Sequence, residues 1–202
     1  MKNSYSNIFP ISKKTLNKAK GLLTKESLVA LPTETVYGLA GNAYSAAAVK
    51  KIFNLKGRPT SNPLIIHYYN IEKALDDIVI NNNFKKLYKK FCPGPITFIL
   101  KKKKNSKIQA SANAKLKTVA VRFPKHKILI TILKNINFPL AMPSANKSSS
   151  VSPVCAQDVF DEFKKKIKFI VNGGQSIIGI ESTVIDLTDT PKILRPGIID
   201  PF

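Results

Sequence analysis

The 202-residue chain has no tryptophan, two histidines and two cysteines. Cys92 and Cys155 lie far apart and form no Cys-x-x-Cys pair, which excludes the usual spacing of a zinc site or a redox motif. No apolar run reaches the roughly eighteen residues of a membrane-spanning helix. The N-terminus also lacks the continuous apolar segment of a secretory signal. We therefore expect a cytoplasmic protein with two inert thiols and no membrane partner.

Acidic residues are scarce as well. The chain has 12 Asp and Glu and 33 Lys and Arg, which gives a formal net charge of +21. Such a positive field attracts partners that carry phosphate, whether nucleotides or RNA. Nearly all of the excess is lysine, however, and lysine, isoleucine and asparagine are abundant everywhere, as under a compositional bias. We interpret the lysine run at 101–104 as a solvated strand end. Arginine is rare, so we expect chemistry where it occurs.

No internal repeat or linker divides the sequence, so we expect one domain over 1–202 with its core at about 12–197. Helical spacing and capping residues predict helices at 12–26, after Ser45, at 70–78, 82–91 and 127–135, and from Ser152 and Pro153 onward. Apolar runs predict strands at 27–32, 64–68, 96–101, 118–124, 139–146, 168–174, 182–187 and 192–197. This alternation predicts an α/β domain with a twisted mixed sheet and flanking helices.

Polar residues gather where the expected strands end. The stretch "LPTETVYGLAGNA" at 31–43 is too polar and too rich in glycine for a core, so we expect it to line a site. Similar clusters follow other strands, at 56–62, 67, 118–122, 144–146, 181–183 and 195–197. Open α/β sheets bind ligands at strand ends. One cluster alone has a local explanation as a turn, but the whole series predicts a binding site.

Two clusters indicate an anionic ligand. Lys56 and Arg58 are two residues apart, so in an extended segment both side chains point to one side and offer donors to phosphate or carboxylate oxygens. Ser144 and Asn146 follow a strand, where hydroxyl, amide and backbone N–H groups can cradle an anion. The alternatives are a solvated basic turn and an ordinary Ser/Asn turn.

Several catalytic motifs are absent. The sequence has no Gly-x-x-x-x-Gly-Lys-Ser/Thr loop, no Gly-x-Ser-x-Gly motif and no cysteine–histidine arrangement. We therefore expect no covalent nucleophile. His67, at a strand end, either has a structural role or hydrogen-bonds a ligand. His126 lies on an expected helix and is interpreted as solvated.

Six motifs carry a family resemblance: "LPTETVYGLA", "KGRPTSNPLIIH", "TVAVRFP", "PSAN", "IESTVID" and "LRPG". From about Ser12 to Gly197 the chain resembles the YrdC-like domain of threonylcarbamoyl-adenylate synthases, in its single-domain type. The resemblance implies a fold shared with dihydroxybutanone-phosphate synthase, with a twisted mixed sheet around a basic cavity. It also implies a reaction in which L-threonine, bicarbonate and ATP give threonylcarbamoyl-AMP and pyrophosphate, for N6-threonylcarbamoyladenosine modification of tRNA.

The resemblance further implies roles for individual residues. The family's catalytic lysine–arginine and serine–asparagine set corresponds to Lys56, Arg58, Ser144 and Asn146. ATP contacts are implied for Arg58, Asn62, Thr118, Ser144, Ser152 and Arg195. Threonine contacts are implied for Thr33, Thr35, His67, Arg122 and Ser182. Glu34 either fixes its loop or approaches a metal. Mg²⁺ is expected together with ATP, and no protein ligand is assigned to it.

In the implied mechanism, the threonine amine adds to carbon dioxide derived from bicarbonate, and the resulting carbamate attacks the α-phosphate of ATP. Positioning and charge neutralisation by Lys56, Arg58 and Mg²⁺ replace a protein nucleophile. A downstream threonylcarbamoyl-transferase complex is the implied recipient of the product, and direct contact with tRNA is left open.

Two positions depart from the family pattern. Met142 and Pro143 stand where the family usually has threonine or another small residue before the serine, so a hydroxyl contact to threonine is either absent or replaced by backbone. Ser149 stands where a glycine is usual, so that loop is expected to follow a different path.

Two other classes of protein remain open. The first is a non-catalytic module that binds double-stranded RNA or tRNA, which the charge favours; however, the chain lacks the aromatic strand motif of an RNA-recognition domain. The second is a sugar-phosphate enzyme of the same fold, which would need an acidic metal cluster that the motifs do not supply.

Overall fold

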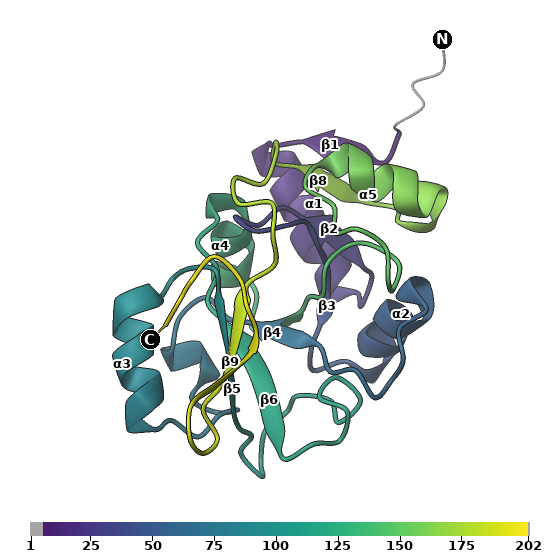
Figure 1. The fold of residues 1–202 in the computed structure, drawn as a ribbon. Helices are drawn as coiled ribbons and strands as arrows, with labels where there is room; N and C mark the ends of the chain where they lie inside the picture. The colour runs from purple at the N-terminus through teal and green to yellow at the C-terminus, as the bar shows by residue number, and fades with distance from the viewer. Residues whose placement is uncertain (1–5, 202) are drawn as a thin grey trace.

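The strands of the computed structural model, which describes residues 6–201, are β1 Ile8–Pro10, β2 Val29–Leu31, β3 Gly38–Asn42, β4 Ile65–His67, β5 Ile96–Lys101, β6 Thr118–Arg122, β7 Leu140–Ala141, β8 Ile170–Asn172, β9 Thr183–Asp186 and β10 Lys192–Arg195. Within the described residues they form one ten-stranded sheet in the order β1-β8-β2-β3-β7-β4-β6-β5-β9-β10 (Figure 1). The sheet contains both parallel pairs, such as β4 with β6, and antiparallel pairs, such as β5 with β6. The expected mixed sheet is confirmed.

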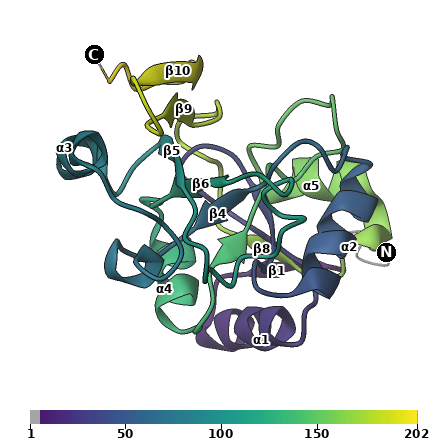
Figure 2. The same cartoon turned by 90° about the horizontal axis from the view of Figure 1, so that it is seen from below.

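The helices of the same region are α1 Lys13–Thr24, α2 Ala46–Lys56, α3 Asn82–Phe91, α4 Lys127–Lys134 and α5 Ala156–Phe163, with 3-10 turns η1 Glu72–Ala74 and η2 Lys164–Lys166. Side chains of α1 and α4 pack together in one apolar cluster. Side chains of α2, α3 and α5 belong to a second apolar cluster. Figure 2 shows α1 and α4 on one side of the sheet, away from β9 and β10. None of the helices in 6–201 is long and apolar enough to cross a membrane.

The strands separate the two clusters because successive side chains of a strand point to opposite faces. On β2, Val29 and Leu31 join the cluster of α1 and α4, whereas Ala30 between them joins the other. On β3, Leu39 and Ala40 divide in the same way. The polar segments that leave these strands are therefore anchored on both sides of the sheet.

Two of the predicted capping residues, Ser12 and Ser45, cap their helices as expected. Ser12 Oγ accepts from the Thr15 backbone N–H at 3.0 Å at the start of α1. Ser45 Oγ accepts from the Ala48 N–H at 3.1 Å at the start of α2. Gly57 ends α2 with φ +58°, a left-handed conformation that favours glycine.

Three expectations about secondary structure are wrong. The segment at 70–78 contains only the three-residue turn η1, and the side chain of Asp77 is instead buried and accepts from Tyr44 and Tyr68. The helix expected from Ser152 begins later, at Ala156, because the Asp158 carboxylate accepts from the Cys155 N–H and fixes the first turn there. Strands β1 and β3 were not expected at all.

β3 is hard to recognise because its sequence, "GLAGN", has few residues that favour strands. Its small residues are required by close packing. A Cβ atom at Gly41 would come within 3.0 Å of Leu28 Cδ2 and 3.1 Å of Ile52 Cδ1. The glycines attributed to a binding loop therefore belong in part to a central, buried strand.

Candidate active site

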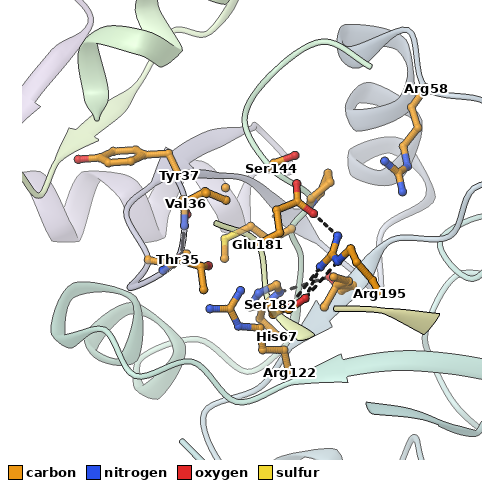
Figure 3. Close-up of a pocket in the computed structure, with 15 residues that line it drawn as sticks. Thr35, Val36, Tyr37, Arg58, His67, Arg122, Ser144, Glu181, Ser182 and Arg195 are labelled. Carbon is orange, nitrogen blue, oxygen red and sulfur yellow. Dashed lines mark hydrogen bonds and ion pairs between the residues drawn. The ribbon is translucent and has the colours of Figure 1, made fainter. Parts of the chain in front are cut away.

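A pocket lies where β4, β6 and β10 end and where the loops before β3 and β9 meet (Figure 3). The last residues of those three strands, His67, Arg122 and Arg195, line it together with Arg58 from the loop after α2. Arg58, Arg122 and Arg195 are all the arginines in the chain. The expectation that arginine marks chemistry therefore leads to a single pocket, which also contains the carboxylate of Glu181.

The loop between β2 and β3 is held by a buried ion pair. Arg122 Nη2 donates to Glu34 Oε1 at 2.7 Å, and both side chains are less than one tenth exposed. Thr33 and Thr35 are buried in the same loop. The expectation that this stretch is too polar for a core is wrong, because the loop is buried: the threonine hydroxyls bond within it, and Glu34 bonds Arg122. Glu34 fixes the loop through Oε1, which is the first of its two expected roles, and its Oε2 has no hydrogen-bond partner among the described residues.

Two threonine hydroxyls form a compact network in this loop. Thr33 Oγ1 donates to the Val36 carbonyl at 2.7 Å and lies 2.8 Å from Thr35 Oγ1. The same oxygen accepts from the backbone N–H groups of Thr35 and Val36, at 3.0 and 3.2 Å. The network holds Thr35 toward the pocket, where Figure 3 shows its side chain.

His67 is the buried histidine of the pocket. Burial, and then the neighbouring Arg122 guanidinium, hold its pKa well below the ordinary value of 6.5. The imidazole is therefore neutral at physiological pH, and one ring nitrogen can accept a hydrogen bond while the other donates. His126 does not line the pocket, and it is partly buried rather than solvated, since burial lowers its pKa as well.

Glu181 and Arg195 form an ion pair at the other side of the pocket, shown by dashed lines in Figure 3. The Arg195 fork also donates to the Ser182 carbonyl, at 3.1 Å from Nε and 2.9 Å from Nη2. Glu181 Oε1 accepts from Ser152 Oγ at 2.8 Å. Burial raises the pKa of Glu181, but Arg195, Ser152 and other donors outweigh it, so the net shift is downward. The carboxylate stays ionised and fixes Arg195.

Arg58 is fixed by its own loop. Its Nε donates to the Asn62 carbonyl at 3.0 Å, and Nη2 donates to Asn62 Oδ1 at 2.6 Å and to the Pro63 carbonyl at 2.9 Å. Nη1 takes part in none of these bonds. The guanidinium therefore faces the pocket with one donor group left for a ligand.

Lys56 differs from the expectation of an extended segment, because it is the last residue of α2 and its side chain is 2% exposed. Its ammonium donates to the carbonyls of Ser144, at 2.7 Å, and of Asn146. A third contact reaches Asn146 Oδ1 at 3.4 Å. Burial, with Arg58 nearby, lowers the pKa of Lys56 to about 8. In this arrangement Lys56 holds the 144–146 turn.

The structure thus divides the candidate site residues into those that line the pocket, those that lie behind the lining, and one that lies elsewhere. The pocket is lined by Thr33, Thr35, Arg58, His67, Arg122, Ser144, Ser182 and Arg195. Lys56, Asn62 and Ser152 each contact a lining residue, and Asn146 lies behind them in contact with Lys56. Thr118 does not line the pocket, because it begins β6, four residues and roughly 13 Å of strand before Arg122.

Sequence reasoning missed some of the lining. Glu181 lies in one of the polar clusters of the sequence without an expected role, although the Glu-Ser-Thr run beside a strand is its signal. Met142 packs on Gly38, where a Cβ atom would come within 2.5 Å of Met142 Cγ. Ser149 adopts φ +73°, the conformation that favours glycine, so its backbone matches a glycine position rather than a new path.

This fold and this site define an α/β protein in which a mixed sheet carries a polar, arginine-lined pocket at its strand ends. A model of the Sua5/YciO/YrdC domain family, described as telomere recombination, matches residues 21–197. The chain therefore belongs to the Sua5/YciO/YrdC family.

Named relatives agree with this placement. The chain is 46% identical over 182 residues to the threonylcarbamoyl-AMP synthase of Pyrococcus abyssi, covering 89% of this chain and 53% of that protein. It is 43% identical over 183 residues to the Bacillus subtilis protein of the same name, with 89% and 52% covered. A crystal structure of Pyrococcus abyssi Sua5 complexed with L-threonine matches with a TM-score of 0.90 and 43% identity, covering 94% of this chain and 57% of that one. The chain spans about half the length of these relatives.

Proposed function

We propose that this protein is an L-threonylcarbamoyladenylate synthase, a nucleotidyltransferase that condenses L-threonine, bicarbonate and ATP to threonylcarbamoyl-AMP and pyrophosphate. The proposal rests on residues that are far apart in the sequence but line the same pocket. Thr33, Thr35, His67, Arg122 and Ser182 come from four separate segments of the sequence and line one pocket. The names of the relatives, and the L-threonine complex of Pyrococcus abyssi Sua5, support the same activity.

The half of the pocket around Arg122 fits an amino acid. Arg122 lines the pocket, and its Nε has no hydrogen-bond partner among the described residues, so we assign this guanidinium to the α-carboxylate. Thr35 and the neutral imidazole of His67 offer partners for a hydroxyl and an amine. Pocket walls that include Val36, Ile65 and Met142 can contact a methyl group. These groups match the side chain and backbone of threonine.

The half around Arg58 and Arg195 fits a nucleotide. Among the described residues, the bonds of Arg58 to Asn62 and Pro63 leave Nη1 for a phosphate oxygen, and Ser144 also lines the pocket with a hydroxyl. Ser182 lies between the two halves, because its hydroxyl is 2.7 Å from Thr97 Oγ1 and its carbonyl is held by Arg195. A carbamate formed on threonine would then face the α-phosphate in a pocket with cations on both sides.

The chemistry requires two bond-forming steps. The threonine amine attacks carbon dioxide, which bicarbonate gives by losing hydroxide; the N–C bond forms, and the proton that leaves the amine combines with the hydroxide to give water. A carbamate oxygen then attacks the α-phosphorus, and the bond to the β-phosphate oxygen breaks, which releases pyrophosphate. Arg58 and Arg195 would stabilise the charge on the phosphoryl oxygens, and Lys56 would keep Ser144 in place. No residue need form a covalent intermediate.

Magnesium is proposed to arrive with ATP. Glu181 is the carboxylate of the pocket lining, and its two oxygens already contact Ser152 and Arg195. Within residues 6–201, no group of three or more His, Cys, Asp or Glu side chains is placed to hold a metal ion. These residues fit an ion coordinated mainly by phosphate oxygens and water, which would neutralise charge on the leaving pyrophosphate. We further propose that the product is passed on for tRNA modification in the cytoplasm.

Calorimetric titration with L-threonine tests the amino-acid site. Thr35→Val removes a buried hydroxyl at nearly constant volume and should weaken binding about three- to tenfold. Thr131→Val makes the same change on the exposed side of α4, where the Thr131 hydroxyl donates to the Lys127 carbonyl, and should leave affinity unchanged. Equal affinity for L-threonine and L-serine, or an unaffected Thr35→Val variant, would remove threonine from this pocket.

A further inference from the structure

A second concave site lies outside the arginine-lined pocket and shares no lining residue with it. This lysine groove, with a volume of about 530 Å³, is lined by the end of α1 and the residues after it, one face of α2, and residues 166–168. In Figures 1 and 2, α2 and α5, which η2 directly follows, lie on the same side of the molecule. Its size is typical of a ligand-binding site.

The floor of the lysine groove is apolar and belongs to the core. Leu22 packs against the cluster of α1 and α4. Leu28, Leu55 and Ile167 belong to the other cluster or pack against it. Ile167 is buried, whereas the three leucines remain half-buried at the surface. Both apolar clusters therefore reach the surface at this groove, and their packing holds its floor rigid.

The rim of the groove is positively charged and uncompensated. Lys51, Lys166 and Lys168 are exposed, and no acidic residue in the described part of the chain lines the groove. Lys51 Nζ donates to the backbone carbonyl of Glu26 at 2.9 Å, which neutralises no charge. None of the ion pairs found among residues 6–201 involves these three lysines.

The lysines stand on opposite sides of the floor. Lys51 and Leu55 are one turn apart on α2, so they share a face of that helix. Lys166 and Lys168 flank Ile167, which is extended with φ −95° and ψ 120°. In such a segment the lysines point away from the buried isoleucine. An occupant would thus meet apolar groups in the middle and ammonium groups along both edges.

We propose that the lysine groove docks an acidic amphipathic helix of a partner protein. Such a helix presents an apolar stripe to the floor and carboxylates to both rims, which is how amphipathic helices bind hydrophobic grooves. Charge complementarity then sets register and partner choice. RNA fits less well, because the lining has no aromatic side chain on which a base could stack and its leucines offer nothing to phosphate. A membrane surface fits less well too, because the apolar floor is recessed.

Fluorescence anisotropy with the full chain tests the proposal. The probe is a fluorescein-labelled peptide with leucines at i, i+3, i+4 and i+7 and glutamates on both flanks; a peptide of the same composition with scrambled order is its control. The patterned peptide should bind at least tenfold more tightly. Equal binding of the two peptides would overturn the proposal, because net charge alone would then explain the affinity.

Charge reversal locates the site. K51E/K166E/K168E should weaken binding of the patterned peptide at least tenfold, since each exposed pair contributes modestly and reversal adds repulsion. K85E/K86E/K89E makes the same change in net charge on exposed positions of α3 and should change affinity less than threefold. Similar losses in both variants would overturn the proposal.

Leu55→Arg separates docking from electrostatics. The arginine adds positive charge but places a polar group over the floor, so docking predicts weaker binding and simple charge attraction predicts tighter binding. A thermal melt checks that the variant folds, and the charge-reversal comparison stands without it.

A 20-base-pair RNA duplex is the last probe: if its binding is lost in K51E/K166E/K168E but kept in K85E/K86E/K89E, the groove is a nucleic-acid site and the proposal is wrong.

Discussion

Arg122 and Glu34 join the end of β6 to the loop between β2 and β3 through a buried 2.7 Å contact. One partner is a lining residue of the pocket and the other holds the loop that carries Thr33 and Thr35. The geometry of the proposed amino-acid site thus depends on a pair of charges that are 88 residues apart in the chain.

Removing one member of this pair should destabilise the protein strongly. Glu34→Ala leaves the Arg122 guanidinium buried without its counter-charge, and we expect a loss of roughly 3–5 kcal/mol in the free energy of unfolding. Glu34→Gln keeps an acceptor at the same place and should cost less. Urea denaturation measures both. A Glu34→Ala variant as stable as wild type would show that the pair does not hold the loop.

Arg58→Lys should lower kcat/KM by about ten- to a hundredfold. Lysine keeps the charge but cannot reproduce the three hydrogen bonds to Asn62 and Pro63 while offering another donor to a ligand. A charge-assisted hydrogen bond of roughly 1.5–3 kcal/mol corresponds to that change in rate. Steady-state kinetics beside a thermal melt decides the point. Unchanged turnover in a variant with an unchanged melting temperature would place Arg58 outside the chemistry.

Lys56 should make stability depend on pH in the alkaline range. Its folded-state pKa of about 8 is lower than the ordinary value of 10.5, so between these values the unfolded chain binds more protons than the folded one. The free energy of unfolding of wild type should therefore rise with pH from about 8 to 10.5, relative to Lys56→Met. At neutral pH, Lys56→Met should also be destabilised by roughly 1–3 kcal/mol for each carbonyl left unpaired.

Denaturation of both proteins from pH 7 to 10.5 measures the difference. Parallel curves across this range would contradict a depressed Lys56 pKa. A stable Lys56→Met variant with the activity of wild type would contradict the role of Lys56 in holding the 144–146 turn.

Gly38 and Met142 should show strong coupling. A methyl group at Gly38 would lie 2.5 Å from Met142 Cγ, close to the root of that side chain, so Gly38→Ala should cost about 1–3 kcal/mol. Met142→Ala removes the obstacle, and Gly38→Ala should then cost much less. A double-mutant cycle by urea denaturation measures this. Equal costs in the two backgrounds would mean that the loop moves to admit the methyl group.

The sequence predicts some parts of this molecule much better than others. Helices α1 and α2 are predictable because a serine cap precedes a regular apolar spacing in each. β3 is not, because its glycines are required by tertiary packing, of Gly41 against Leu28 and Ile52 and of Gly38 against Met142, which local sequence patterns do not reveal. The same limit explains why only the turn η1 forms in the segment 70–78. Asp77 is buried there and accepts hydrogen bonds from Tyr44 and Tyr68, which the local sequence does not reveal.

The site shows a similar division. Scarcity of arginine correctly indicates the pocket, because Arg58, Arg122 and Arg195 all line it. Which polar side chains face a ligand and which support others depends on tertiary contacts. Lys56 and Asn146 look like binding residues in sequence, yet in the structure they contact each other.

Release of pyrophosphate from ATP tests the proposed synthase most directly. With the purified chain, Mg²⁺, ATP and bicarbonate, we predict release that requires L-threonine, falls strongly with L-serine, and disappears when bicarbonate is removed. A non-catalytic RNA-binding module would release none under any of these conditions. Release at the same rate without an amino acid, or none with all three substrates present, would contradict the account.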